Sequence, residues 1–98
     1  MKRKEGYLLR KIGMSYMIVP IKDGLIQIEG MLTLNETGAF LWEQLKEEKT
    51  KKELLEAILS EYDVDKEIAS TDIQEFLEKA KRSNILSEWK KLWSIYTG

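Results

Sequence analysis

The chain has 98 residues, 43% of them hydrophobic and 34% charged, which is typical of one soluble globular domain. Its 16 Lys and Arg nearly balance its 17 Asp and Glu, and a formal net charge of -1 disfavours a protein that binds nucleic acid through a basic surface. The sequence has neither Cys nor His, which excludes disulfides, thiolate nucleophiles, histidine bases and the usual ligands of transition metals.

The sequence also predicts the compartment. It has no apolar run near the roughly 20 residues needed to span a bilayer. Its charged start, Met1 to Glu5, leads into no apolar signal-peptide block. We therefore expect a cytoplasmic protein without a membrane partner.

Extended structure is predicted for the first third of the chain. Four segments have the composition of strands: residues 7–12, 15–21, 25–28 and 31–34. Asp23 and Gly24 give a strong turn signal between the second and third segments. Gly30 interrupts the chain before the fourth segment, as a bulge or a tight bend.

Three amphipathic helices are predicted for the rest of the domain. The first follows Asn35, a good N-cap, and the second begins at a capping box formed by Thr50 and Glu53. The third follows the N-cap Asp65 and ends near Asn84, which suits a left-handed C-terminal position. Apolar residues at helical spacing line one face of each helix: Ala39, Leu41, Trp42 and Leu45; Leu54, Leu55, Ile58, Leu59 and Tyr62; and Ile68, Ala69, Ile73, Phe76, Leu77 and Ala80.

Strands followed by three helices with short connections favour an α+β fold, in which a three-stranded antiparallel sheet precedes a winged helix-turn-helix-like set of helices. We assign this domain to residues 1–86 and treat residues 87–98 as a C-terminal extension. In that extension Trp89, Leu92, Trp93 and Tyr96 fall on one face of a short helix. This aromatic tail is expected to pack back on the domain, to form a homodimer, or to cover a groove or dock on a partner enzyme.

The sequence offers no catalytic motif. Without His or Cys the usual nucleophile–base pairs cannot be built, and the glycine spacing matches no phosphate-binding loop. The acidic residues lie mostly opposite the apolar stripes, where carboxylates are normally solvated surface. We therefore expect no enzymatic activity, no cofactor and no metal site.

A winged-helix DNA-binding regulator is the rival interpretation, because the predicted layout suits it. A recognition helix presents basic and amide side chains to the major groove. The third predicted helix, from Asp65 to Arg82, instead carries five acidic and four basic residues, so phosphate would repel it over most of its length. We therefore expect no nucleic-acid partner.

The stretch from Gly30 to Trp42, Gly-Met-Leu-Thr-Leu-Asn-Glu-Thr-Gly-Ala-Phe-Leu-Trp, resembles the PqqD family. These small proteins and domains are also called recognition elements for RiPPs, the ribosomally synthesised and post-translationally modified peptides. The likeness continues through residues 50–62, the Val64-Asp65 step and residues 72–77, and it covers residues 6–86. The run from Met31 to Ala39 is fairly specific, whereas the helical remainder is weaker.

The resemblance implies a winged helix-turn-helix of three strands and three helices without a cofactor of its own. Such a module binds the leader of a precursor peptide, which adds as a β-strand to the edge of the third strand and packs beside the third helix. It then presents the precursor to a separate modifying enzyme, often a radical SAM enzyme. This chain departs from the pattern by the extra extended residues 25–28, which leaves open the segment that pairs with the leader, and by the aromatic tail.

Two sets of residues are candidates for the peptide-binding site. They are Gly30, Met31, Leu32, Thr33 and Leu34 before the first helix, and Asp72, Ile73, Phe76, Leu77, Lys79 and Ala80 on the third helix. The first set forms either a pairing edge or an ordinary internal strand. On the helix, Ile73, Leu77 and Ala80 are most simply core, and Phe76 belongs to the core or to a groove. Asp72 and Lys79 either border the groove or form a solvated face.

Overall fold

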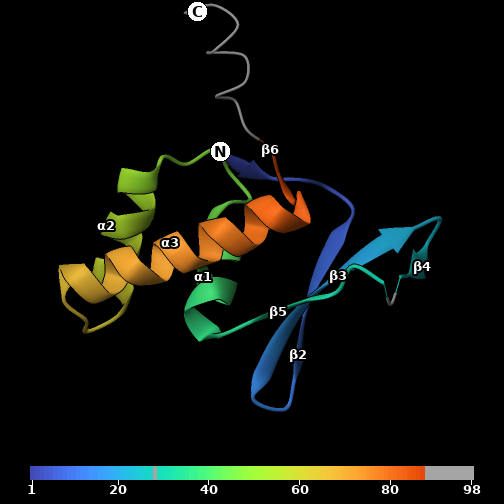
Figure 1. Ribbon diagram of the computed structural model, residues 1–98, viewed down its shortest axis with the longest axis horizontal. Coiled ribbons are helices and arrows are strands. Elements are labelled where there is room, and N and C mark those ends of the chain that lie inside the picture. The colour runs from blue at the N-terminus through green and yellow to red at the C-terminus, as the bar shows by residue number, and fades with distance from the viewer. Residues whose placement is uncertain (28, 88–98) are drawn as a thin grey trace, which may run out of the picture.

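Three helices and a small sheet lie side by side in the computed structural model, which describes residues 1–27 and 29–87 (Figure 1). The described strands are β1 (Lys2–Arg3), β2 (Tyr7–Ile12), β3 (Ser15–Lys22), β4 (Leu25–Ile26), β5 (Leu32–Leu34) and β6 (Leu86–Ser87). The helices are α1 (Glu36–Gln44), α2 (Lys51–Glu61) and α3 (Lys66–Ser83). The mixed α+β class and the three helices expected from the sequence are confirmed.

β3 is the central strand of the larger sheet. It pairs antiparallel with β2 through residues 15–20 on one side. On its other side it pairs with β5 through residues 16–18 and with β4 through Ile21 and Lys22. The sheet thus has a short fourth strand beyond the three expected, because Asp23 and Gly24 both adopt positive φ, the geometry of a tight hairpin turn, and fold β4 back on β3.

β1 and β6 form a second, two-stranded antiparallel sheet, in which Lys2 pairs with Ser87 and Arg3 with Leu86. The N–H of Arg3 donates to the carbonyl of Leu45, 2.8 Å away, so β1 also borders the end of α1. Two-residue strands carry no periodic signal, and sequence reasoning therefore missed both. The aromatic tail positions from Trp89 to Tyr96 lie outside the described residues.

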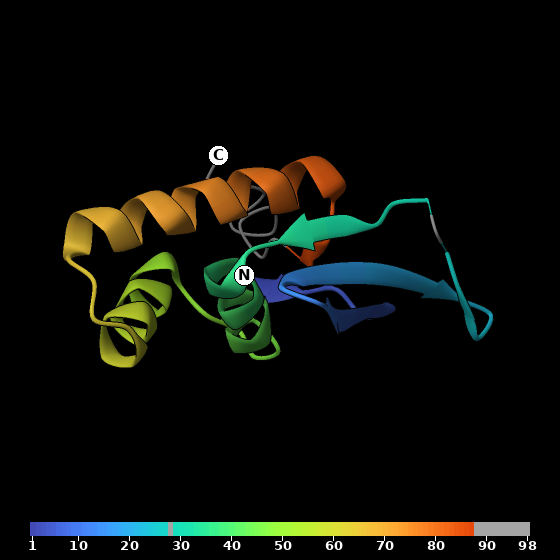
Figure 2. The same cartoon turned by 90° about the horizontal axis from the view of Figure 1, so that it is seen from below.

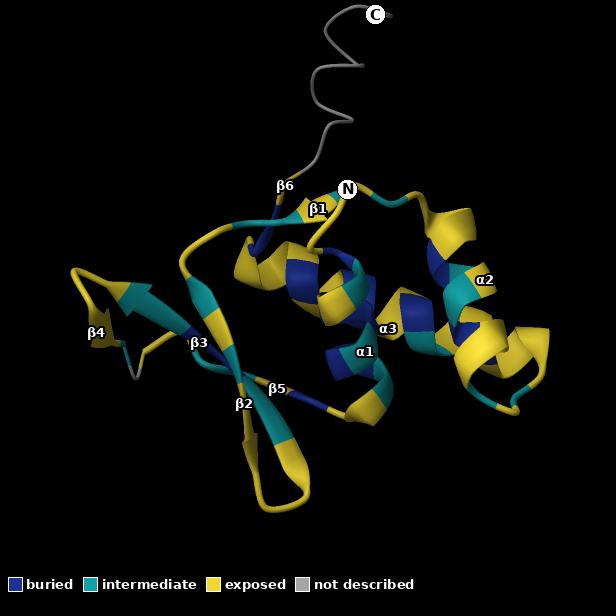
Figure 3. Ribbon diagram, turned by 180° about the vertical axis from the view of Figure 1, so that it is seen from behind, coloured by how far each residue is buried: buried dark blue, intermediate teal, exposed yellow. Residues whose placement is uncertain are grey.

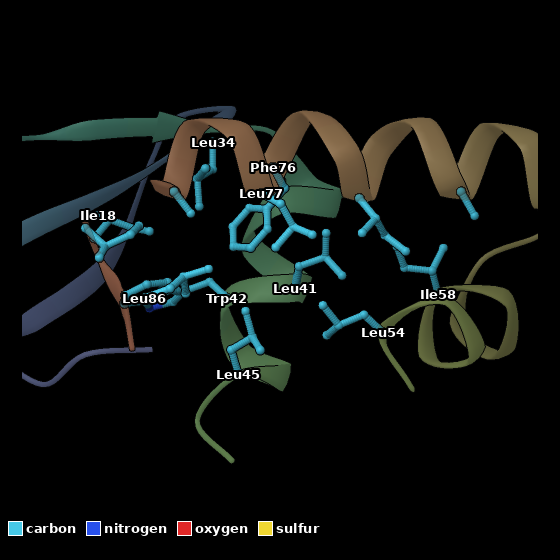
Figure 4. Close-up of a cluster of buried hydrophobic side chains, with 14 residues drawn as sticks. Ile18, Leu34, Leu41, Trp42, Leu45, Leu54, Ile58, Phe76, Leu77 and Leu86 are labelled. Atoms are coloured by element: carbon cyan, nitrogen blue, oxygen red, sulfur yellow. The ribbon is translucent and has the colours of Figure 1, made fainter. Parts of the chain in front are cut away.

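The hydrophobic core lies between the helices and one face of the sheet (Figures 3 and 4). Leu34 from β5, Trp42 from α1, Ile58 from α2 and Phe76 from α3 all belong to it. Most residues of the stripes predicted for the helices make this contact, since a helix stabilises itself in a small domain mainly by burying such a stripe. Leu59 and Ile68 were also predicted on these stripes, but they are exposed, at 37% and 51%. Among the described helices, none combines the length and the apolar character of a membrane-spanning helix.

The helix boundaries follow the predicted caps. The side chain of Asn35 accepts a hydrogen bond from the N–H of Gly38 at 2.8 Å, and that of Asp65 accepts one from the N–H of Ile68 at 3.0 Å. Asn84 ends α3 in the left-handed conformation, with φ at 54°. These caps satisfy backbone groups that would otherwise lack a partner at the helix ends.

The capping box of α2 predicts a specific acid sensitivity. The N–H of Thr50 donates to Glu53 Oε1 at 2.9 Å, and the N–H of Glu53 donates to the Thr50 hydroxyl at 3.1 Å. The hydrogen bonds from the backbone and then the side chain of Thr50 hold the pKa of the Glu53 carboxyl below its ordinary value of 4.5. A folded pKa below the unfolded one gives stability that is present above the unfolded pKa and is lost as the pH falls through the folded pKa.

We therefore expect the Glu53→Gln variant to lose less thermal stability than the wild type when the pH is lowered below 4.5. Melting curves across that range measure the difference. The matched control is Glu56→Gln, which removes an exposed glutamate from the same helix outside the capping box. Parallel acid profiles for wild type and Glu53→Gln would contradict the stabilising role of the ionised capping box.

Candidate functional site

The outer edge of β5 has no strand partner among the described residues, because the pairing found for β5 is the one with β3. Figure 2 shows α3 running alongside β5 on the side away from β2 and β3. A strand edge presents a row of backbone N–H and C=O groups that can pair with another extended chain. The pairing of β5 with β3 determines which of these groups point outward.

Two hydrogen bonds fix the direction of the backbone groups along β3. The N–H of Ile21 donates to the carbonyl of Gly6 at 2.8 Å, on the side of β2. The N–H of Gln27 donates to the carbonyl of Pro20 at 2.9 Å, on the side of β4. The backbone N–H and C=O groups of successive residues in a strand point toward opposite neighbouring strands. The backbone groups of the even-numbered residues of β3 therefore point toward β4 and β5.

The backbone of Thr33 therefore faces the open side of β5. Tyr16 and Ile18 direct their backbone groups toward β5, where they pair with Leu34 and Leu32. These two leucines consequently direct their own N–H and C=O groups back to β3. Thr33 lies between them, and its N–H and C=O point away from β3. These two groups can therefore pair with an additional strand.

A small hollow lies between β5, the start of α1 and α3. Its free volume is about 20 Å³, which is room for about one water molecule. It is lined by Leu34, Asn35, Gly38, Asp72, Glu75, Phe76 and Lys79. Leu34 and Phe76 are also core residues, buried to 3% exposure each, so the apolar floor of the hollow is the outer surface of the core. A ligand at this place would contact apolar side chains below and charged ones at the border.

Gly38 keeps the start of α1 close to β5. A Cβ atom at this position would lie 3.2 Å from Asn35 Oδ1 and 3.3 Å from side-chain atoms of Leu34. These distances are tighter than ordinary van der Waals contact, so a larger residue would push α1 away from the strand. Packing thus explains Gly38, as capping explains Asn35, although both also line the hollow.

The candidate residues on α3 divide into two groups. Ile73, Leu77 and Ala80 are buried in the core. Asp72, Phe76 and Lys79 line the hollow, with Phe76 in both environments. Sequence reasoning missed Glu75, although its position three residues after Asp72 and four before Lys79 is the signal that places it on the same helix face.

On the strand side, Leu34 lines the hollow, and Leu32 packs against the core. Met31 is partly buried, and the side chain of Thr33 is exposed. Gly30 turns the chain into β5 with φ at 87°, a conformation that favours glycine. Leu25 and Ile26 of β4 lie on the same side of β3 as β5 but near the other end of that strand, away from the hollow.

The described residues hold no group of three acidic side chains placed to bind a metal ion. Two ion pairs are found among them, from the N-terminal amine to Glu48 and from Arg3 to Glu43, and neither involves the hollow. The arrangement is suited to binding an extended chain through backbone hydrogen bonds, apolar contact and charge.

The family model described as Coenzyme PQQ synthesis protein D (PqqD) matches residues 25–86. No curated protein matches the chain. Among solved structures, the chain is similar to one described as TbiB1 in complex with the TbiA(beta) leader peptide, with a TM-score of 0.65 and 24% sequence identity over 91% of this chain and 98% of that one. This likeness shows a shared fold. Since the family model spans well over half of the sequence, this chain belongs to the PqqD family.

Proposed function

We propose that this protein binds the leader of a ribosomally made precursor peptide as an added strand on β5 and presents it to a separate modifying enzyme. The observation that carries the proposal is the outward-facing backbone of Thr33 beside the hollow under α3. Membership of the PqqD family supports it, as does the similar structure of TbiB1, which is described in complex with a leader peptide.

Strand addition suits a ligand that is a peptide rather than a folded protein. Main-chain hydrogen bonds to the strand edge supply affinity for any extended sequence, and contacts with alternate side chains supply selection. In this chain the selecting surface would be the floor formed by Leu34 and Phe76 and the charged border on α3. The hollow is small, so the leader's apolar side chain would lie over the floor rather than enter a deep pocket.

β2 offers a second free edge, but it is a poorer binding site. Within the described residues β2 pairs with β3 alone. Its Arg10 and Lys11 are exposed, and charged residues of this kind protect edge strands from pairing with foreign chains. The hollow beside β5 provides apolar and charged contacts to hold a peptide, and it has no contribution from β2.

The role we propose is non-catalytic and needs no cofactor. The modification would be made by the partner, for which the family resemblance favours a radical SAM enzyme. We place this step in the cytoplasm, where precursor peptides are made. The rest of the surface is then available for the contact with that enzyme.

Nuclear magnetic resonance tests the binding mode directly. Uniformly labelled protein is titrated with synthetic copies of the leader parts of candidate precursor peptides from the genome that encodes this protein. We expect the largest amide shift changes at Thr33 on β5, at Met31 just before it, and at Asp72, Glu75 and Lys79 on α3, with β2 unaffected. A scrambled peptide is the control. Changes centred on β2, or none at all with the intact leader, would contradict the proposal.

A further inference from the structure

We propose that the border of the hollow selects its peptide by a charge pattern. The peptide would carry a basic side chain beside Asp72 and Glu75, an apolar side chain over Leu34 and Phe76, and an acidic side chain beside Lys79. This inference rests on the proposed function and defines the chemical class of leader that the site takes.

The charges at the border are not used by the fold. Asp72, Glu75 and Lys79 make no side-chain hydrogen bond and no ion pair within the part of the chain that is described. Glu75 and Lys79 are four residues apart in the order that favours an ion pair on a helix, and yet no such pair forms. Their charges thus remain available to a ligand.

Some other polar side chains of α3 do have partners. Gln74 accepts a hydrogen bond from Lys51 of α2 at 3.1 Å and donates one to Glu78 at 3.1 Å. The hydroxyl of Thr71 donates to the carbonyl of Glu67 at 3.0 Å. Gln74 and Thr71 thus have partners within the fold, whereas the side chains of Asp72, Glu75 and Lys79 have none in the described part of the chain, like those of Lys66, Glu67, Lys81 and Arg82 at the ends of the helix.

Helix geometry sets the spacing expected in the peptide. Asp72 and Lys79 are seven residues apart on α3, which corresponds to a rise of about 10 Å at 1.5 Å per residue. An extended peptide covers that length in about three residues at 3.3 Å each. Side chains on one face of a strand recur every two residues, so a basic and an acidic position with the apolar one between them on that face should be four residues apart.

Partial burial should let Asp72 contribute more to the charge preference for peptides than a fully exposed charge would. Asp72 is partly buried, whereas Glu75 and Lys79 are exposed. Exposed pairs contribute little individually, and reversing a charge replaces an attraction by a repulsion. We therefore expect reversal of the acidic pair to change the preference between oppositely charged peptides by about tenfold.

Selection from a random peptide library tests the inference on peptides of any sequence. A displayed library of random 12-residue peptides is panned against the wild type and against the double variant Asp72→Lys with Glu75→Lys. The control is Glu67→Lys with Glu78→Lys, which makes the same change in net charge on the same helix at exposed positions outside the hollow. Circular dichroism verifies that each variant is folded.

We expect the wild type and the control to enrich peptides with a basic and an acidic residue four positions apart and an apolar residue midway between them. The Asp72→Lys, Glu75→Lys variant should lose the preference for the basic residue and favour an acidic one in its place. Enrichment of peptides with the same charges by all three proteins would overturn the charge pattern while leaving strand addition intact. Failure of the wild type to enrich any peptide would overturn the proposed function and this inference with it.

Discussion

Thr33→Pro is expected to lower the affinity for the leader peptide by about tenfold or more while leaving the domain folded. Proline removes the N–H group that faces the open side of β5, and its ring occupies the space that a neighbouring strand needs. A hydrogen bond of this kind contributes about 0.5–1.5 kcal/mol net, which is up to about tenfold in affinity, and the steric conflict adds to that loss.

The same geometry explains why the fold should tolerate this substitution. Leu32 and Leu34 make the pairing with β3, and neither loses a backbone group in Thr33→Pro. Proline is found in sheets at edge positions whose N–H faces solvent, which is the position of Thr33. The residue before it, Leu32, is already extended, as the residue before a proline prefers to be.

Two variants make the measurement specific. Thr33→Ala changes the side chain but keeps the N–H group, so calorimetric titration should give an affinity close to that of the wild type. Lys11→Pro makes the equivalent change on β2, because Lys11 pairs with Tyr16 and faces the outer side of that strand. We expect it to leave binding unchanged. Loss of binding in Lys11→Pro with retention in Thr33→Pro would transfer the site to the β2 edge.

Much of the fold could be predicted because local signals and burial agree. The caps at Asn35, Thr50 and Asp65 mark the helix starts, and the apolar stripes mark the faces that became the core. The turn at Asp23 and Gly24 was equally clear. Such consistency between local preference and global packing is what allows a sequence to specify one structure.

The candidate site was less predictable, because it depends on which side of a strand is left open. Alternation along residues 31–34 shows that two faces exist, but the direction of the Thr33 backbone follows from its pairing with β3, which only the tertiary structure gives. Helical periodicity likewise places Ile73 and Phe76 on one apolar face of α3. It does not show that the first is wholly core while the second also borders a hollow.

Phe76 belongs both to the core and to the hollow, so its truncation is expected to lower stability as well as peptide binding. The side chain is buried at 3% exposure within the main core cluster, so Phe76→Ala should lower the free energy of unfolding by about 3–5 kcal/mol. That is a large part of the roughly 5–15 kcal/mol that stabilises a typical domain. Urea unfolding at low temperature measures this loss even if the variant is only partly folded at room temperature.

A second core variant separates the two roles of Phe76. Leu45 is completely buried at the end of α1 and does not line the hollow, and Leu45→Ala should cost about 2–5 kcal/mol. A ligand that binds only the folded state raises stability by an amount set by its concentration relative to its Kd. Saturating leader should therefore stabilise Leu45→Ala as much as the wild type, and stabilise Phe76→Ala clearly less. Equal stabilisation of both variants would show that Phe76 contributes to the core and not to peptide binding. The apolar contact with the peptide would then have to come from Leu34 alone.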